Sequence, residues 1–438
     1  MERRDEYVEK LSKLIKKETI SDWEEKDLTK FREFQDILRE VFPNVFNRCE
    51  FKDFDGSFLL IWKGNDSKKL PVMFMNHHDV VEATGKWNHE PFGAEVSDGK
   101  IWGRGTFDTK GGLFSMLQAA EELIDEGFIP DRDIYFESTC NEETTGHGGD
   151  MISNWMVSEG IKLDMVFDEG GMIMYDPIGG ADGTFAVVGV GEKGCCDIKF
   201  IARSNGGHAS MPPKNTPLVR LGKFMNEVEK KYPFERKLND TTKELFRRVG
   251  PYMGALGFVL KNNGIFGGLI KKVMPSVSTA AGAMLGTTLA FTMAEGSGAT
   301  NVIPQEAYVI GNMRFSHHEG RDASIAKIKP IADKYDIEIE IIDPGFTSGI
   351  ASYEGEAFKL IEAGVKEVFP NVDKTVPYVV TGASDARFYD RVCDQCMRFL
   401  PFQIDDDQLA GMHGLNESID IDSLTYAVDF YKYMMKNI

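Results

Sequence analysis

The sequence predicts an α/β fold with a central, mostly parallel sheet that is interrupted by an inserted α+β domain. Short apolar runs alternate with amphipathic helices in residues 1–189 and again in residues 318–438, as in a parallel sheet covered by helices. Residues 190–317 instead read as strand, helix, strand and strand. The length of 438 residues also exceeds that of one ordinary domain. We therefore expect one domain from residues 1–189 and 318–438, and a second domain inserted between them at 190–317.

The first domain opens with a helix, because residues 27–42 carry apolar side chains at three- and four-residue steps and stop before Pro43. A second amphipathic helix is expected over 111–128, with Gly127 at its end. The apolar runs that predict strands lie at 57–62, 70–76, 132–139 and 163–169. Ligands bind beyond the carboxyl ends of the strands in sheets of this kind.

The insert is expected to contain a strand at 195–204, a helix at 217–232 and strands at 289–296 and 306–317. Residues 249–286 are rich in Gly, Met and aliphatic side chains. This segment predicts buried helices, with a wall for an apolar substrate or a subunit contact as the alternative. The α/β pattern then resumes with helices at 323–335, 356–369 and 422–437 and strands at 337–343 and 376–382.

The composition disfavours several classes of partner. Fifty basic and 69 acidic residues give a net charge of 50 − 69 = −19, which argues against nucleic acid and against an anionic membrane as partners. The N-terminal segment lacks the apolar stretch of a signal peptide, and no run of about 18 apolar residues predicts a membrane helix. Six cysteines are few for this length and favour a cytoplasmic location, and we expect Cys393 and Cys396 to be structural thiols rather than a metal or redox pair.

Polar groups recur at the ends of the apolar runs and in glycine-rich loops, where the strand ends of an α/β sheet would converge. They are His77, His78 and Asp79, then Asp108, the pair Glu142 and Glu143, the pair Asp168 and Glu169, and His413. Crowded carboxylates repel one another unless cations neutralise them. Imidazole and carboxylate are ligands of zinc, and two histidines with three carboxylates suit a pair of divalent ions. Metal-assisted hydrolysis is the expected chemistry.

The same residues carry a resemblance to a known family. The motifs NHHDVV, WNHEPF, DGKIWGRGTFDTKGG, NEETTGHGG, FDEGG, GGHAS, ATNVIP, TGASDAR and MHGLNE occur in the order typical of the co-catalytic zinc peptidases. That family includes carboxypeptidase S, aminoacylase and succinyl-diaminopimelate desuccinylase. The similarity runs from about residue 55 to 420, and the tryptophan and PF of WNHEPF resemble the carboxypeptidase S branch most. It implies a zinc-peptidase-like catalytic domain with a lid or dimerisation domain inserted into it.

The resemblance also implies roles for individual residues. His77 and Glu169 would bind one metal ion, His413 and Glu143 the other, and Asp108 both. Asp79 would orient His77 from behind, and Glu142 would be the general base. The implied cofactors are two divalent ions, Zn²⁺ by affinity order, with Co²⁺ and Mn²⁺ as alternatives.

Further candidates lie in the insert and near the C-terminus. His208 resembles the lid histidine that stabilises the oxyanion in this family, often from a partner subunit. Asn301 and Arg314 match substrate-binding positions, and a guanidinium at Arg314 implies a substrate with a free carboxylate. Gly382, Ala383 and Ser384 resemble the loop at the carboxylate end of the site. A homodimer formed through the lid is implied, although the enlarged insert leaves the oligomeric state open.

Other histidines have no expected role in the chemistry. His78 faces the opposite side of its strand from its neighbours and is predicted to be structural. The histidines for which no motif suggests a role are His89, His147, His317 and His318. The chain departs from the family pattern at Glu82, where a proline is common, and at Thr109, where carboxypeptidase S relatives have a second aspartate. Neither departure removes a metal ligand.

The sequence therefore predicts a cytoplasmic, metal-dependent hydrolase that cleaves the amide of an N-acyl amino acid or of a short peptide with a free C-terminal carboxylate. A dipeptidase or tripeptidase that needs a free N-terminus is the first alternative. A binding protein on the same fold is a distant alternative, because such a protein would be expected to lose Glu142 or a metal ligand. The acyl group, the C-terminal residue, the metal and the oligomeric state are left open.

Overall fold

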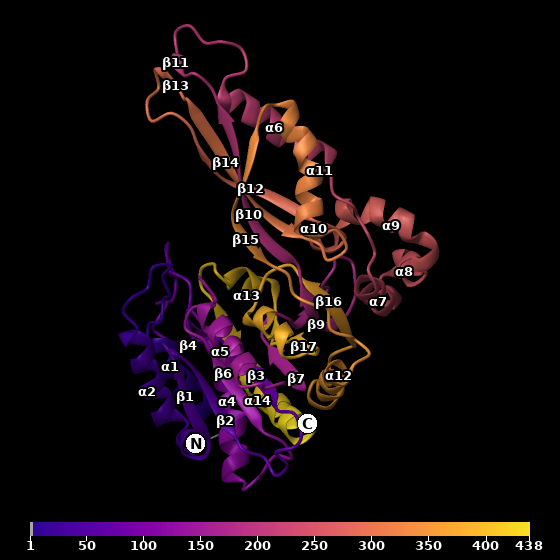
Figure 1. The fold of residues 1–438 in the computed structure, drawn as a ribbon. Helices are drawn as coiled ribbons and strands as arrows, with labels where there is room; N and C mark the ends of the chain where they lie inside the picture. The colour runs from indigo at the N-terminus through magenta and orange to yellow at the C-terminus, as the bar shows by residue number, and fades with distance from the viewer. Residues whose placement is uncertain (1–2) are drawn as a thin grey trace.

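The computed structural model describes residues 3–438, which form two domains built on separate sheets (Figure 1). The larger sheet has ten strands, nine of them in the order β1-β2-β6-β3-β7-β17-β9-β8-β18, with β16 paired to β9. Their bounds are β1 Glu50–Phe54, β2 Ser57–Trp62, β3 Val72–Met75, β6 Ile134–Ser138, β7 Met165–Asp168, β8 Met172–Tyr175, β9 Thr184–Glu192, β16 Lys374–Val380, β17 Cys396–Arg398 and β18 Gln403–Ile404.

The middle of this sheet is parallel, as the sequence predicts. Strands β6, β3, β7 and β17 pair in parallel, whereas β1-β2-β6 and β17-β9-β8 pair antiparallel. The antiparallel edge begins with a tight hairpin, because Asp55 and Gly56 between β1 and β2 both have positive φ, at 50° and 88°. The result is a mixed sheet in which the parallel strands β6, β3, β7 and β17 end at the same edge, whereas the parallel pair β9 and β16 runs the opposite way.

Helices cover both faces of the ten-stranded sheet. Phe58 and Leu60 point into the core formed with α1 (Arg3–Lys16), α2 (Thr29–Val41), α3 (Pro43–Arg48), α4 (Lys110–Asp125), α12 (Glu356–Val368) and α14 (Ile421–Lys436). Leu59 and Ile61 point to the other face, against α5 (His147–Ser158) and the 3₁₀ segment η2 (Asp385–Arg391). Burial on both faces explains why the strands read as continuous apolar runs.

A small three-stranded sheet positions two of the candidate loops. It consists of β4 (Glu95–Ser97), β5 (Lys100–Trp102) and β19 (Ser418–Asp420), in the order β19-β5-β4. Asp108 follows β5, and His413 lies between α13 (Asp406–Gly411) and β19. The pairing of β5 with β19 therefore brings two loops together that lie about 300 residues apart in the chain.

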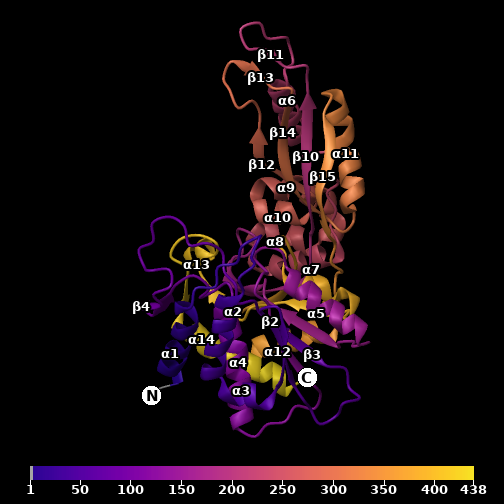
Figure 2. The same ribbon diagram turned by 60° about the vertical axis from the view of Figure 1, so that its left-hand side comes forward.

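The inserted domain contains a four-stranded antiparallel sheet in the order β12-β14-β10-β15. Its strands are β10 Gly194–Arg203, β12 Thr288–Glu295, β14 Glu306–Phe315 and β15 Glu338–Phe346, with α6 (Pro217–Lys231) and α11 (Gly320–Lys334) packed against one face. The short ribbon of β11 (Gly207–His208) and β13 (Val302–Ile303) lies at the far end (Figure 2). Because β15 pairs with β10 in this sheet and α11 packs against it, we propose that the inserted domain extends to residue 346 rather than to 317.

Residues 240–284 form a helical module beside the two sheets. It comprises α7 (Asp240–Val249), the 3₁₀ turn η1 (Gly250–Tyr252), α8 (Gly254–Lys261), α9 (Asn263–Val277) and α10 (Thr279–Met284). Its inner face packs on Phe185 and Val376 of the ten-stranded sheet. The expected buried helices are therefore present, but they bury one face only.

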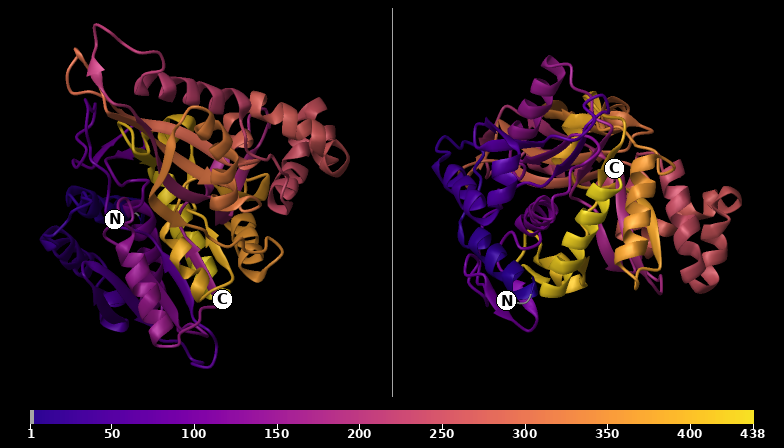
Figure 3. Two further views of the ribbon diagram at one scale, coloured as in Figure 1. Left: turned by 45° about the horizontal axis from the view of Figure 1, so that its top comes forward. Right: turned by 90° about the horizontal axis from the view of Figure 1, so that it is seen from below.

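The two connections between the sheets run side by side. Gly191 forms an isolated bridge with Ile350, and the Ala351 N–H donates to the Val190 carbonyl at 2.7 Å. Both described chain ends lie in the domain of the ten-stranded sheet (Figure 3). Among residues 3–438, none of the helices has the length and apolar character needed to cross a bilayer.

Candidate metal centre

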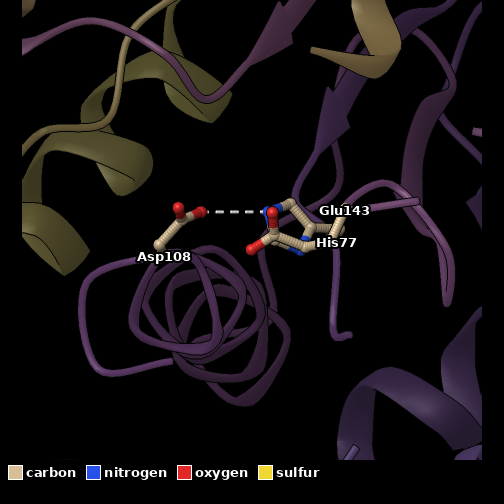
Figure 4. A group of neighbouring side chains, drawn as sticks. All are labelled: His77, Asp108 and Glu143. Carbon is tan, nitrogen blue, oxygen red and sulfur yellow. Dashed lines mark hydrogen bonds and ion pairs between the residues drawn. The ribbon is translucent and has the colours of Figure 1, made fainter. Parts of the chain in front are cut away.

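His77 follows β3 and is almost completely buried, at 3% exposure. Its Nδ1 lies 3.0 Å from the Asp79 carbonyl oxygen and its Nε2 lies 3.1 Å from Asp108 Oδ1. The ring is thus fixed on one side by its own loop and directed on the other side at the Asp108 carboxylate (Figure 4).

Asp108 lies between two imidazoles. Its Oδ1 faces His77, and its Oδ2 lies 3.1 Å from His413 Nε2. The peptide bond between Asp108 and Thr109 is cis, and the Thr109 hydroxyl donates to the His77 carbonyl at 3.0 Å. A carboxylate with one oxygen toward each histidine has the arrangement required of a ligand shared by two cations.

Asp79 anchors the loop that follows β6. Its Oδ1 accepts the Glu142 N–H and its Oδ2 accepts the Glu143 N–H, both at 3.1 Å, and the Ser21 hydroxyl donates to Oδ2 at 2.7 Å. Asp79 Oδ1 also lies 3.4 Å from His77 Nδ1. Because its oxygens are occupied in this way, Asp79 orients both His77 and the two glutamates.

The remaining candidate ligands lie around the same point. Glu143 Oε2 is 2.9 Å from His413 Nε2, and ligand atoms of His77, Asp108 and Glu143 all lie within 4.8 Å of one another. Glu169 directly follows β7, and burial raises its pKa, as do the charges of Asp168, Asp108 and Glu142. This imidazole and carboxylate donor set fits divalent metal ions of the zinc type.

Without cations the cluster holds extra protons. Burial and then the charge of Asp108 raise the pKa of Glu143 to about 7. Hydrogen bonds to Asp108 and Glu143 raise the pKa of His413 to about 10. Burial lowers the pKa of His77, but its contacts with Asp108 and Asp79 outweigh that effect and raise it well above its usual value.

We expect the free energy of unfolding of the metal-free protein to fall as the pH rises from about 5 to about 7. In this range the folded protein holds more protons than the unfolded chain, because the pKa of Glu143 is raised to about 7, so raising the pH favours unfolding. The slope is up to about 1.4 kcal/mol per pH unit for each buried group of this kind. Urea titrations of chelator-treated protein measure it, and added zinc should raise the stability and flatten the slope. A metal-free protein that is more stable at about pH 7 than at about pH 5 would contradict this.

Glu417 is a structural residue of the site that sequence reasoning missed. It is fully buried, accepts the N–H groups of Gly105, Phe107 and Asp108 at 2.8–3.1 Å, and pairs with Arg104 at 2.8 Å. Arg104 in turn donates to the Gly414 carbonyl at 2.8 Å. The pair therefore ties the loop of Asp108 to the loop of His413. Only its place at the end of the MHGLNE motif signalled it.

Arg387 is a second missed residue. Its Nη1 lies 3.3 Å from Glu142 Oε1, and its guanidinium stacks on the rings of Phe346 and Phe388. Gly146 makes room for it, because a Cβ there would lie 2.2 Å from Arg387 Nη2. The guanidinium thus places a positive charge beside Glu142, the general-base candidate, and packs on Phe346 at the end of β15.

We expect Arg387→Met to shift the acidic limb of the kcat/KM profile to higher pH by about one unit. Burial raises the pKa of Glu142, and Arg387 is among the groups that lower it. Without the guanidinium, less Glu142 is ionised at low pH, so activity at about pH 6 should fall about tenfold. Arg391→Met, in the same 3₁₀ segment but paired with Asp150, is the matched control. An unshifted profile for Arg387→Met would contradict the contact.

The predicted substrate residues are spread over the molecule. Ser384 is buried, and its hydroxyl donates to Glu192 at 2.9 Å; Gly382 and Ala383 precede it in the loop after β16. Arg314 lies on β14 with its Nε donating to Asn312 at 3.0 Å. His208 and Asn301 are adjacent at the distal ribbon, where the Ala209 N–H donates to the Asn301 carbonyl at 3.0 Å. Within one chain this ribbon is remote from the metal centre (Figure 1).

The other histidines and the cysteines take no part in the cluster. His78 is buried, stacks on Phe34 with centroids 5.2 Å apart, and lies 2.8 Å from the Ser138 hydroxyl, and burial lowers its pKa to about 3. The other histidines make contacts elsewhere: His89 stacks on Trp102, His317 hydrogen-bonds to the Ser348 carbonyl, and His318 hydrogen-bonds to the Glu235 carbonyl. His147 is the first residue of α5. Cys393 and Cys396 are buried free thiols.

Comparison with known proteins identifies the family. The family model described as peptidase family M20/M25/M40 matches residues 73–437. A probable carboxypeptidase S-like 2 of Dictyostelium discoideum is 30% identical over 99% of this chain and 85% of its own length. The N-fatty-acyl-amino acid synthase/hydrolase PM20D1.1 of Danio rerio is also 30% identical, over 100% of this chain and 86% of its own.

Among solved structures, the fold is similar to that of an M20 family metallo-carboxypeptidase from Sulfolobus solfataricus. The two share a TM-score of 0.71 and 17% identity over 99% of both chains. The predicted fold class and the resemblance to the carboxypeptidase S group are thereby confirmed. The chain belongs to peptidase family M20/M25/M40.

Proposed function

We propose that this hydrolase uses two metal ions to cleave the amide bond of an N-acyl amino acid, or of a short peptide with a free C-terminal carboxylate. The observation that carries the proposal is the position of Asp108, with one oxygen toward His77 and the other toward His413. Relatives named carboxypeptidase S-like and N-fatty-acyl-amino acid synthase/hydrolase act on bonds of this class by their names. The general-base candidate Glu142 lies in the same loop as the ligand candidate Glu143.

In this proposal His77 and Glu169 hold one ion, His413 and Glu143 hold the other, and Asp108 contacts both. Zn²⁺ is the first choice by affinity, with Co²⁺ or Mn²⁺ as alternatives. When bound, such ions polarise the scissile carbonyl and lower the pKa of water. The geometry of the cluster supports this assignment because the ligand atoms of His77, Asp108 and Glu143 already converge.

Glu142 accepts the proton of the attacking water and returns it to the leaving nitrogen. Its buried position and its contact with Arg387 at 3.3 Å hold the carboxylate beside the ligand cluster. Asp79 keeps the Glu142 loop and His77 in register through its hydrogen bonds. General acid–base catalysis of this kind accelerates such steps by about 10²–10⁴-fold.

Substrate recognition is assigned to Arg314, to the Gly382–Ser384 loop, and to His208 with Asn301. Arg314 would bind the free carboxylate, and His208 would stabilise the oxyanion. Because His208 lies on the remote ribbon, we propose that it acts on the site of a partner chain in a homodimer formed through the inserted domain. The six free cysteines support a cytoplasmic setting.

The test is amine release from a panel of N-acetyl amino acids, N-long-chain-acyl amino acids and unblocked dipeptides, with zinc-loaded protein. We expect the protein to cleave N-acyl amino acids. It should not cleave the same compounds when the free carboxylate is replaced by a carboxamide. If only unblocked dipeptides react, the chain is a dipeptidase or tripeptidase. If nothing reacts while metal is bound, the binding-protein alternative holds.

A further inference from the structure

The outer face of the helical module carries an exposed apolar ridge. On α9, Ile265, Leu269, Val273 and Val277 follow one another at four-residue steps and so share a face of the helix. Ile265 is 82% exposed, and Leu269 and Val277 are 50% exposed. Phe258 of α8 adds a 66% exposed ring, with its centroid 5.9 Å from that of Phe266. A contiguous patch of this kind marks an interaction surface.

The charge around this apolar ridge is opposite to that of the whole chain. The chain carries −19, yet residues 245–294 contain no Asp or Glu. Lys261 lies one turn after Phe258 on α8 and Lys272 lies one turn after Leu269 on α9, and neither forms an ion pair within residues 3–438. Lysines beside exposed Phe, Ile and Leu on a helix are typical of helices that lie in a membrane interface.

The module is also placed so that a flat surface could reach it. The hairpin of α8 and α9 projects from the side of the molecule (Figure 3). The cluster that forms its inner face contains none of the candidate site residues, so the ridge is not a wall of the metal centre. A flat partner could therefore contact the ridge without covering the site.

We propose that the α8–α9 hairpin binds an anionic lipid surface, with the apolar ridge at the acyl boundary and Lys261 and Lys272 against the headgroups. This interaction goes beyond the proposed hydrolysis and does not depend on it. The net charge of −19 disfavours the approach to an anionic surface. Charges more than about 8 Å from the contact are largely screened, so the lysines at the contact determine the electrostatic part of the binding free energy. Each lysine near such a surface strengthens binding about fivefold.

The test is vesicle flotation with phosphatidylcholine alone and with added phosphatidylglycerol. The full-length protein should float with the anionic vesicles, and high salt should release most of it. Ile265→Ser combined with Leu269→Ser should abolish flotation, and Lys261→Gln combined with Lys272→Gln should weaken it about 25-fold. The matched controls, Val157→Ser for an exposed apolar residue and Lys68→Gln for a lysine without an ion pair, should bind as the wild type does.

A second readout separates lipid from protein partners. Phe258→Trp should gain fluorescence that brominated lipids quench, beyond any quenching of the wild type. If the wild type stays unbound, or the ridge variant floats as well as the wild type, the proposal is wrong. If the wild type is instead a dimer that Ile265→Ser with Leu269→Ser converts to a monomer, without flotation, the ridge is a contact between two copies, and the lipid proposal is overturned.

Discussion

Glu142→Gln lowers kcat by about 10³-fold and leaves the metal content unchanged. Glutamine keeps the size of the side chain and its contact with Arg387, but it cannot accept the proton of the attacking water. Glu142 is not among the three side chains whose ligand atoms converge. Steady-state kinetics on a blocked amino acid, together with metal analysis of the same preparation, measures both quantities.

Glu143→Gln is the matched comparison, because it changes the adjacent residue in the same way. Glu143 contacts His413 at 2.9 Å, so its loss should reduce the metal content as well as kcat. Full activity of Glu142→Gln, or loss of metal by that variant, would contradict the separation of the two roles.

Glu417→Ala destabilises the protein by about 3–5 kcal/mol. The change leaves the guanidinium of Arg104 buried without its partner and removes the acceptor of three backbone N–H groups around Asp108. Urea unfolding monitored by tryptophan fluorescence measures the loss. Glu417→Gln, which retains one acceptor oxygen, should cost less.

Glu90→Ala provides the surface control for this prediction, since Glu90 is exposed, and it should stay within about 0.5 kcal/mol of the wild type. If Glu417→Ala is as stable as Glu90→Ala, the buried pair does not hold the loops of Asp108 and His413 together.

The sequence predicts the convergence of the metal-centre candidates because each follows an apolar run or lies in a glycine-rich loop. His77 after β3 and Glu169 after β7 lie at one edge because neighbouring parallel strands end together. For Asp108 and His413, only the order of the family motifs predicted that the two residues belong to one site. In the structure, the pairing of β5 with β19 brings their loops together.

Other features depend on contacts that local patterns do not encode. Periodicity identifies β15 as a strand but not the sheet that it joins, and the later domain boundary that we propose depends on this pairing. The contact of Arg387 with Glu142 joins residues 245 positions apart. The exposure of Ile265 and Leu269 could not be predicted either, since an apolar helix face reads as buried unless its packing partner is known.

We propose that two metal ions share Asp108. The most direct test is the number of zinc ions bound per chain, measured by mass spectrometry of dialysed protein and compared with Asp108→Ala. We expect two ions per wild-type chain and at most one in the variant, with activity lost in parallel. A fully active wild type with a single ion, or an Asp108→Ala variant that keeps both, would contradict it.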